Sequence, residues 1–223
     1  MKLKNNIKLL ITCDSGAAAG KTTAAKYLSK KFGLQLLTSG LLYRFVAFKV
    51  LELNKKKINF SFIKKIAKNI NSKSLQNSKL YSPSVTEYTI KIAKIYKIRK
   101  ILRSYQNKFS KKKLAILEGR DMGILFPKAD IKFFFKCSLN TAAKRRFGDF
   151  KKINKNITLK EVKNALKIRN QVDSTRKFSP LRIPQGAVIV DTTKLNKKQM
   201  FNKVYKIVDE KLRIKYGRNY KKR

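Results

Sequence analysis

The sequence predicts an α/β fold in which a parallel sheet of about five strands is flanked by helices. Short apolar runs alternate along the chain with segments of helical periodicity, a pattern typical of strands and helices that cover both faces of one sheet. The chain has 223 residues, 43% of them apolar. This is enough for a single core that carries insertions.

The first predicted elements are a strand, a turn, a helix and a second strand. Residues 7–13, IKLLITC, are expected to form a buried strand, and GKTTAAKYLSKKFG follows as a helix that Gly33 ends. LQLLT, at 34–38, is the second strand, and Ser39 is expected to cap the helix GLLYRFVAFKVLEL. The glycine-containing turn after the first strand lies where such units bind phosphate.

The middle of the chain has a different and more basic pattern. Residues 40–112 are expected to form an insertion on the sheet. The piece at 69–84 is rich in turn residues, and VTEYTIKIAKIYKIRKILRSYQNKF after it is expected to be helical.

Alternation of strand and helix then returns. KLAILEGRDMG (113–123) and IKFFFKC (131–137) contain strands, and the second is followed by the helix NTAAKRRFGDF. Residues 159–178 are expected to form a polar helix pair or one long helix. AVIVDTT (187–193) is the last strand, and NKKQMFNKVYKIVDEKL is the last helix. Residues 213–223, RIKYGRNYKKR, are expected to be a loose basic tail.

The residue types limit the chemistry. The chain has no histidine, so it lacks the commonest general base and most zinc sites. Chemistry must use carboxylates, Lys, Arg, hydroxyls and backbone amides. Cys13 and Cys137 are expected to be reduced core thiols of a cytoplasmic protein, because the N-terminus does not resemble a signal peptide. No apolar run reaches the roughly 18 residues of a membrane span.

The net charge of +44, from 56 basic and 12 acidic residues, predicts attraction to polyanions. We expect weak nucleic-acid binding through the basic surface, without sequence preference, and a contribution from the tail. A genome biased toward Lys, Asn and Ile explains the excess of Lys over Arg. It does not explain the scarcity of acids.

The stretch DSGAAAGKTT matches the end of the P-loop pattern G-x-x-x-x-G-K-[ST]. Ser15 stands where the first glycine belongs, and Gly16 can adopt a left-handed conformation one residue later. Backbone N–H groups and the helix N-terminus cradle phosphates in such loops, Lys21 is placed to reach the β- and γ-phosphates, and Thr22 to hold Mg²⁺. A chance GKT in a turn is the weaker alternative, because strand, loop and helix are all in place.

A second motif, LEGRDMG, follows a predicted strand. It puts Glu118, Arg120 and Asp121 at the carboxyl edge of the sheet, where open α/β sheets bind ligands. Glu118 is placed to orient Mg²⁺ through water, Arg120 to bind a phosphate, and Asp121 to accept from an exocyclic amine or pair with an arginine. By itself, this motif is equally typical of a solvated Arg–Asp turn.

A third motif, RNQVDSTR, spaces Arg169, Asp173 and Arg176 at i, i+4 and i+7, which predicts that they share one helical face. Two arginines beside one carboxylate are suited to hold two phosphate groups. A charged, exposed helix face is the commoner origin of such a triplet.

Taken together, these motifs resemble the bacterial cytidylate kinases, in the nucleoside-monophosphate kinase group of P-loop proteins. The resemblance covers nearly the whole chain. The matching segments occur in the family's order: DSGAAAGKTT, TSGLLYR, IAKIYKIRKILRSYQ, EGRDMGILFP, RNQVDSTRKFSPL and DTT. The GRDMG motif after a long insertion is the specific part.

The resemblance implies a P-loop kinase core with a nucleotide-binding insertion and a small lid that closes over both nucleotides. It implies transfer of the γ-phosphoryl group of ATP to CMP or dCMP, with Mg²⁺, by a cytoplasmic monomer of pyrimidine metabolism. The core is then expected at about 1–39, 113–149 and 184–212, the CMP-binding insertion at about 40–112, the lid at about 150–183 and the tail at 213–223.

The family's site residues transfer where the sequence matches. Those implied to bind ATP are Ser15, Gly16, Ala17, Ala18, Ala19, Gly20, Lys21, Thr22 and Thr23. Those implied to bind CMP are Ser39, Tyr43, Arg44, Arg99, Arg120, Asp121, Arg169, Asp173 and Arg176. The catalytic residues are Lys21, Arg120, Arg169 and Arg176, and the metal site is Thr22 with Glu118 through water.

Four positions depart from the family pattern: Ser15, Thr38, Val172 and Ile90. Ile90 aligns with a serine that helps the family read cytosine. Such changes bear on base selectivity and rate, and they leave UMP or another acceptor as an alternative. A nucleic-acid-binding protein on a decayed kinase scaffold is the second alternative, and the retained acids of the phosphate site oppose it.

Overall fold

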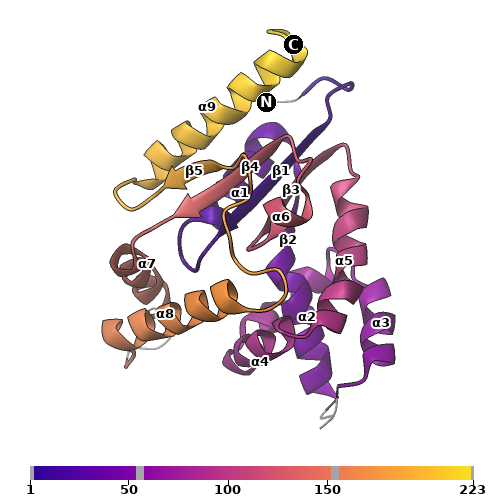
Figure 1. The fold of residues 1–223 in the computed structure, drawn as a ribbon, viewed down its shortest axis with the longest axis vertical. Coiled ribbons are helices and arrows are strands. Elements are labelled where there is room, and N and C mark those ends of the chain that lie inside the picture. Colours follow the sequence, from indigo (N-terminus) through magenta and orange to yellow (C-terminus); the bar gives the residue numbers. More distant parts are fainter. Residues whose placement is uncertain (1–2, 54–57, 152–155, 222–223) are drawn as a thin grey trace. The chain divides into compact units, whose positions relative to one another are not determined.

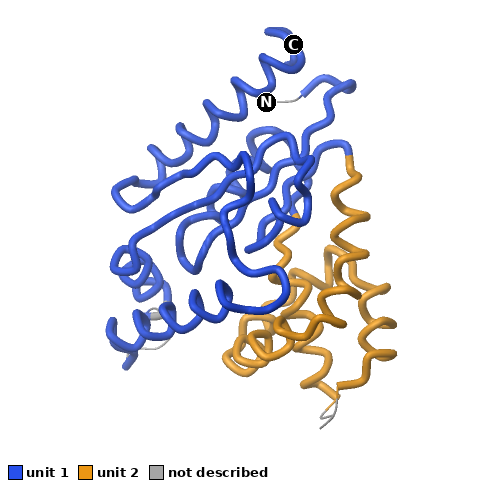
Figure 2. Tube along the Cα trace, viewed as in Figure 1, with its two compact units in different colours: residues 1–36, 113–223 blue, residues 37–112 orange. Residues whose placement is uncertain are grey.

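The computed structural model describes residues 3–53, 58–151 and 156–221. The chain divides into two compact units (Figure 2). Unit 1 comprises residues 1–36 and 113–223, and unit 2 comprises residues 37–112. The expected insertion and lid, 40–112 and 150–183, each include a few positions, 54–57 and 152–155, outside the described residues.

The strands form one five-stranded sheet with the order β2-β3-β1-β4-β5 (Figure 1). The strands are β1 (Leu9–Ser15), β2 (Gln35–Thr38), β3 (Leu114–Gly119), β4 (Ile131–Lys136) and β5 (Val188–Asp191). β1 pairs in parallel with β3 and β4, and β4 pairs in parallel with β5. The predicted α/β class with a parallel sheet is confirmed. β1 extends two residues beyond its predicted end, because Asp14 pairs with Gly119 and Ser15 with Phe135.

Four helices of unit 1 lie close to their predicted positions: α1 (Lys21–Phe32), α7 (Leu139–Lys151), α8 (Leu159–Thr175) and α9 (Lys197–Tyr216). The short helix α6 (Met122–Leu125) was not predicted. The segment predicted as a helix pair or one long helix is the single helix α8. The side chain of Thr158 accepts from the backbone N–H of Glu161, and the Glu161 carboxylate accepts from that of Thr158, so a capping box sets where α8 begins.

One apolar cluster holds α1 and α9 on the sheet. Leu28 and Phe32 of α1 and Val204 and Val208 of α9 are buried together with the apolar residues of β1 and β4. The rings of Phe32 and Tyr205 stack with centroids 5.5 Å apart. Burying one such aliphatic or aromatic side chain contributes about 1.5–3 kcal/mol. The cluster therefore fixes α1, and with it the loop that leads into α1.

Unit 2 is helical. Its helices are α2 (Ser39–Glu52), α3 (Phe60–Lys68), α4 (Pro83–Ala93) and α5 (Tyr96–Ser110), with 3₁₀ turns at Ser74–Gln76 and Ser78–Tyr81. The predicted helical stretch after residue 84 is two helices, because Ile95 has an extended backbone and begins α5 as its N-cap.

The expected capping role of Ser39 is wrong. Thr38 is the N-cap of α2, and Ser39 is already inside the helix. The Ser39 hydroxyl accepts a hydrogen bond from Nε2 of Gln106 at 2.6 Å instead. Both side chains are buried, so this bond ties the start of α2 to α5.

The expected loose tail is also wrong for the described residues. α9 continues to Tyr216, and Tyr220 beyond it is only 1% exposed. The backbone N–H of Lys4 donates to the carbonyl of Tyr220 at 3.0 Å, and Leu3 forms a β-bridge with Lys221. The tail therefore packs against the N-terminal segment, and residues 222–223 lie outside the described part of the chain.

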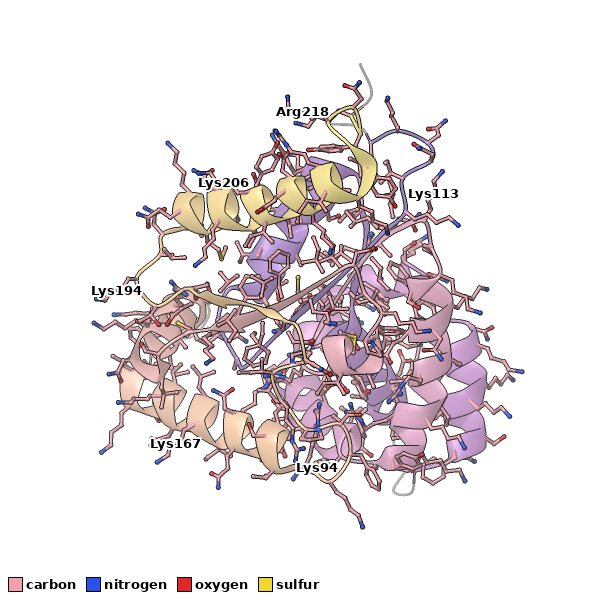
Figure 3. All side chains as sticks on the ribbon, turned by 45° about the horizontal axis from the view of Figure 1, so that its top comes forward. Lys94, Lys113, Lys167, Lys194, Lys206 and Arg218 are labelled. Carbon is pink, nitrogen blue, oxygen red and sulfur yellow. The ribbon has the colours of Figure 1, made fainter. Side chains whose placement is uncertain are left out.

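Exposed basic side chains are distributed over many of the described elements, in agreement with the charge argument. Lys94, Lys113, Lys167, Lys194, Lys206 and Arg218 are all exposed, and in Figure 3 their side chains point away from the ribbon. Among the described helices, none has the length and apolar character needed to cross a bilayer.

Candidate functional site

The loop between β1 and α1 has a backbone that explains its unusual sequence. The left-handed residues are Ala18 (φ 56°) and Gly20 (φ 85°), rather than Ser15 or Gly16. Ser15 is the last residue of a strand, a conformation that any residue adopts, so a glycine is not required there. The expectation that Gly16 takes the left-handed conformation is wrong.

Gly16 is needed for a different reason. A Cβ at this position would lie 3.0 Å from Oδ1 of Asn170, which is tighter than ordinary contacts. The same oxygen accepts a hydrogen bond from the backbone N–H of Ala17 at 2.9 Å. Gly16 therefore lets a side chain of α8 approach the loop backbone. Asn170 is a site residue that the sequence did not indicate, since an Asn on a polar helix has no distinctive pattern.

Lys21 lies at the end of the loop in a buried ion pair with Glu118. Its Nζ is 3.1 Å from Oε1 of Glu118, and the two side chains are 14% and 4% exposed. Burial lowers the pKa of Lys21, as do the neighbouring charges of Arg120 and Arg169, while Glu118 raises it. The structure thus brings the lysine of the loop together with the acid of the second motif, a pairing that the sequence did not specify.

The residues predicted to hold Mg²⁺ fit that ion. The other oxygen of Glu118, Oε2, is buried and has no hydrogen-bond partner among the described residues. Thr22 lies in the first turn of α1. Mg²⁺ prefers oxygen ligands and is usually held by one or two protein groups together with phosphates and water. Within the described residues, no group of three or more His, Cys, Asp or Glu side chains could hold a metal by itself.

Asp14, immediately before the loop, organises the second motif. Its carboxylate accepts hydrogen bonds from the backbone N–H groups of Met122 at 2.8 Å and Gly123 at 2.6 Å. It thereby caps α6 and holds the residues after Arg120 and Asp121 against β1. Sequence reasoning missed this role, although Asp14 opens the quoted loop motif.

Asp14 should make stability depend on pH. Burial raises the pKa of its carboxyl to about 7 from 3.8, although the two backbone hydrogen bonds lower it. The folded chain therefore binds this proton more tightly than the unfolded chain, and this contribution is lost as the pH rises from about 4 to about 7. We expect the natural chain to lose more thermal stability than Asp14→Asn between pH 5 and 8, because Asn does not titrate. Parallel melting curves for the two proteins across that range would contradict this.

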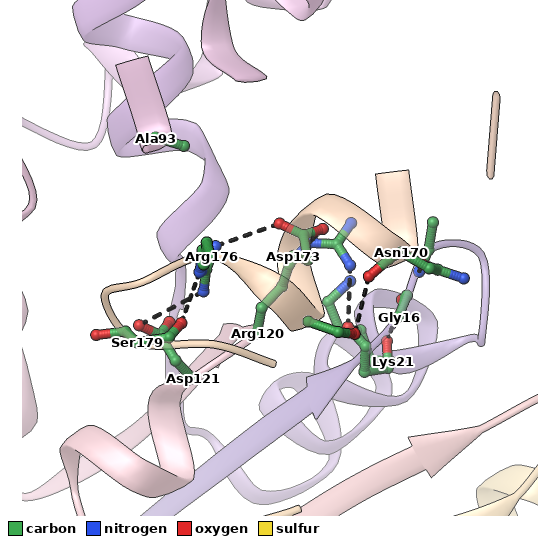
Figure 4. Close-up of polar contacts among 12 residues, drawn as sticks. Gly16, Lys21, Ala93, Arg120, Asp121, Asn170, Asp173, Arg176 and Ser179 are labelled. Carbon is green, nitrogen blue, oxygen red and sulfur yellow. Dashed lines mark hydrogen bonds and ion pairs between the residues drawn. The ribbon is translucent and has the colours of Figure 1, made fainter. Parts of the chain in front are cut away.

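Asp173 and three other charged side chains form a network of ion pairs (Figure 4). Oδ2 of Asp173 is 2.9 Å from Nε of Arg120, and its Oδ1 is 3.2 Å from Nη1 of Arg176. Nη2 of Arg176 is in turn 3.8 Å from Oδ2 of Asp121. Four predicted site residues are therefore brought together, and their charges balance in pairs.

The geometry of this network differs from the predicted helical face. α8 ends at Thr175, and Arg176 follows it with an extended backbone and donates from Nε to the carbonyl of Ser179. Asp173 pairs with Arg120 of the second motif as well as with Arg176. Arg169 instead acts electrostatically on Lys21.

A cavity of about 220 Å³ adjoins the phosphate loop in unit 1. It is lined by Gly20, Thr23, Arg145, Leu195, Asn196, Lys197 and Met200. The guanidinium of Arg145 is held by the carbonyls of Thr192 at 2.7 Å and Leu195 at 3.1 Å. The hydroxyl of Thr192, from the DTT motif, donates to the carbonyl of Ala19 at 3.1 Å. Arg145 was missed because nothing in the sequence distinguishes it from other surface arginines.

Unit 2 contains the remaining predicted site residues. The guanidinium of Arg99 lies 5.5 Å from the ring centroid of Tyr43, and both residues are buried. Nη1 of Arg44 donates to the carbonyl of Leu80 and to the hydroxyl of Thr86. Unit 2 thus brings Arg99 and Tyr43 together, while the Arg44 guanidinium is held by α4 and the turn before it.

Comparisons with known proteins identify the family. The profile of the cytidylate kinase family matches residues 11–210. The cytidylate kinase of Caldanaerobacter subterraneus subsp. tengcongensis is 32% identical over 215 residues, which cover 91% of this chain and 96% of that protein. The cytidylate kinase of Fusobacterium nucleatum subsp. nucleatum is 35% identical over 217 residues, which cover 91% and 98%.

A solved structure supports the fold. An uncharacterized protein from Eubacterium ventriosum has a TM-score of 0.52 and 16% identity, over 91% of this chain and 99% of that one, a likeness that concerns the fold alone. The family profile, in contrast, covers most of the chain, and the relatives align along almost their whole length. The chain belongs to the cytidylate kinase family.

Proposed function

We propose that the protein transfers the γ-phosphoryl group of ATP to CMP or dCMP and forms ADP and the cytidine diphosphate. It does so in the cytoplasm, in pyrimidine nucleotide metabolism. The observation that carries the proposal is the buried Lys21–Glu118 pair at the end of a strand–loop–helix phosphate loop. Membership of the cytidylate kinase family supports the choice of acceptor.

The reaction needs positioning and charge neutralisation rather than a general base. The acceptor oxygen of CMP is already anionic, which agrees with a chain that has no histidine. Lys21, Arg120, Arg169 and Arg176 would neutralise charge on the transferring group. Thr22 directly, and Glu118 through water, would hold Mg²⁺, which when bound with ATP offsets charge on the phosphate oxygens.

The proposed binding roles are those that the resemblance to the family implies. Residues 15–23 would bind the phosphates of ATP, and the cavity beside Gly20 and Arg145 would accept its base. Ser39, Tyr43, Arg44 and Arg99 of unit 2 would bind CMP. The remaining CMP-binding residues would be Arg120, Asp121, Arg169, Asp173 and Arg176 of unit 1.

The direct test is an ADP-release assay with CMP, dCMP, UMP and AMP as acceptors. Turnover with CMP or dCMP above the ATPase background supports the proposal. Turnover with none of the four excludes it.

The hydroxyl of Thr89, next to Ile90, donates to the carbonyl of Val85 at 2.6 Å and is engaged within α4. We therefore expect UMP to compete with CMP, and an enzyme that accepts CMP alone would contradict this expectation.

Two substitutions test the acceptor residues. Asp121→Asn and Arg99→Ala are each expected to raise KM for CMP by about 10- to 100-fold, because each removes a hydrogen bond that involves a charged group. KM for ATP should change much less. Lys100→Ala, at an exposed position of the same helix as Arg99, is the matched control. Equal effects on both substrates would mean that Asp121 and Arg99 have a structural role.

We further propose that the surface charge of +44 gives weak nucleic-acid binding beside catalysis. Because Tyr220 is buried, deleting residues 213–223 would disturb the fold, so exposed lysines are the better probe. Lys203→Gln, Lys206→Gln and Lys211→Gln together on α9 should weaken RNA binding and lower its salt dependence, with kinase activity unchanged. Filter binding across a salt series measures this. No binding at low salt, or binding that ignores salt, would exclude the proposal.

A further inference from the structure

Helix α8 is linked to the phosphate loop directly through Asn170 and indirectly, one turn later, through Asp173. Asn170 accepts the backbone N–H of Ala17 at 2.9 Å. Asp173 acts through Arg120, whose Nε is 2.9 Å from the carboxylate and whose Nη1 donates to the carbonyl of Ser15 at 3.2 Å. Figure 4 draws Asn170, Asp173, Arg120 and Lys21 in one close-up. The helix is therefore linked to one backbone N–H, that of Ala17, and through Arg120 to one backbone carbonyl, that of Ser15.

Asn170 accepts a hydrogen bond from a backbone N–H group that phosphate binding would use. Loops of this kind hold phosphates with their backbone N–H groups, and Ala17 lies in the middle of this one. Ala17 is only 7% exposed, so with Asn170 in place its N–H is shielded from water and makes its hydrogen bond within the protein. The carboxamide oxygen of Asn170 thus stands where a donor phosphate oxygen would accept from Ala17.

The approach of Asn170 depends on the loop sequence as well. A Cβ on Gly16 would lie 3.0 Å from Oδ1 and 3.3 Å from Cγ of Asn170. A cavity of about 520 Å³ is lined in part by Gly16, Ala17, Asn170 and Ser174. The side chain of Asn170 therefore borders open space beside its contact with the loop.

We propose that Asn170 competes with the donor phosphates for the N–H of Ala17 and so sets the affinity for the phosphate donor. The inference rests on the proposed function, because it takes the loop as the donor site. In the nucleotide-free protein Asn170 satisfies the buried N–H and holds α8 on the loop. Binding of the phosphate donor displaces the carboxamide of Asn170, so the position of α8 reports whether the phosphate donor is bound.

Two substitutions of Asn170 should act in opposite directions. Asn170→Ala removes the competitor and should tighten binding of Mg·ADP and of inorganic pyrophosphate by about two- to tenfold, the worth of one neutral hydrogen bond. Asn170→Asp keeps an oxygen at the N–H, strengthens that bond with a charge and repels phosphate, so donor affinity should fall by about tenfold. Gln171→Ala, at an exposed position of α8, is the matched control.

Isothermal titration calorimetry of the full chain measures these affinities, and KM for ATP should follow them while kcat changes less. Hydrogen exchange supplies a second readout. Protection of the Ala17 amide should be lost in nucleotide-free Asn170→Ala and restored by Mg·ADP. If both Asn170 variants bind the donor more weakly, or if Asn170→Ala equals Gln171→Ala, the inference is wrong even where CMP is phosphorylated. If the natural chain binds neither Mg·ADP nor pyrophosphate, both this inference and the proposed function are wrong.

Discussion

Lys21→Ala is expected to lower kcat/KM for phosphoryl transfer by about 10³-fold or more, because it removes a preorganised positive charge from the transferring group. The ammonium group lies in a buried site beside Glu118, where water cannot replace it efficiently. The measurement is steady-state ADP release with CMP as acceptor. Turnover close to that of the natural chain would rule out the assigned catalytic role.

The same substitution disturbs the fold, and a second variant separates the two effects. Without Lys21, the carboxylate of Glu118 is left buried without its partner, a change that costs about 3–5 kcal/mol in such pairs. The double variant Lys21→Ala with Glu118→Gln removes the orphaned charge and should recover much of the melting temperature. Its activity should remain low. Recovery of activity together with stability would mean that Lys21 acts only through folding.

Tyr220→Ala is expected to lower the free energy of unfolding by about 3–5 kcal/mol, the range for loss of a buried aromatic side chain. Tyr220 is 1% exposed, and its hydroxyl is hydrogen-bonded to the carboxylate of Asp209 in α9. Burial and that hydrogen bond raise the pKa of Tyr220 to about 12, so the phenol stays neutral at ordinary pH. Urea unfolding at constant pH measures the loss.

Two controls identify the cause of that loss. Arg218→Ala, at an exposed position of the same segment, should change the free energy of unfolding by less than about 0.5 kcal/mol. Tyr220→Phe keeps the ring and removes only the hydroxyl, so its effect should be intermediate. A Tyr220→Ala protein as stable as the natural one would mean that the C-terminal segment is not part of the cooperative fold.

Local sequence predicted the strands, the phosphate loop and the acids at the sheet edge. A buried parallel strand is recognisable as a continuous apolar run, and a loop with Gly, Lys and Thr before a helix has few other uses. Parallel strands end at one edge, so Lys21 and Glu118 could both be placed at that edge, while their pairing depends on β3 lying next to β1. Agreement with the family motifs then indicated the reaction.

Other features depend on residues far apart in the chain, and only the tertiary structure decided them. Asn170 reaches Ala17 and Arg120 reaches Asp173 because packing brings α8 to the loop, and no local pattern encodes that distance. The tail is basic and looks loose in sequence, but Tyr220 is buried against α9. A local pattern determines which conformation a segment prefers. The partner of each polar or aromatic side chain is determined by which surfaces the whole chain buries together.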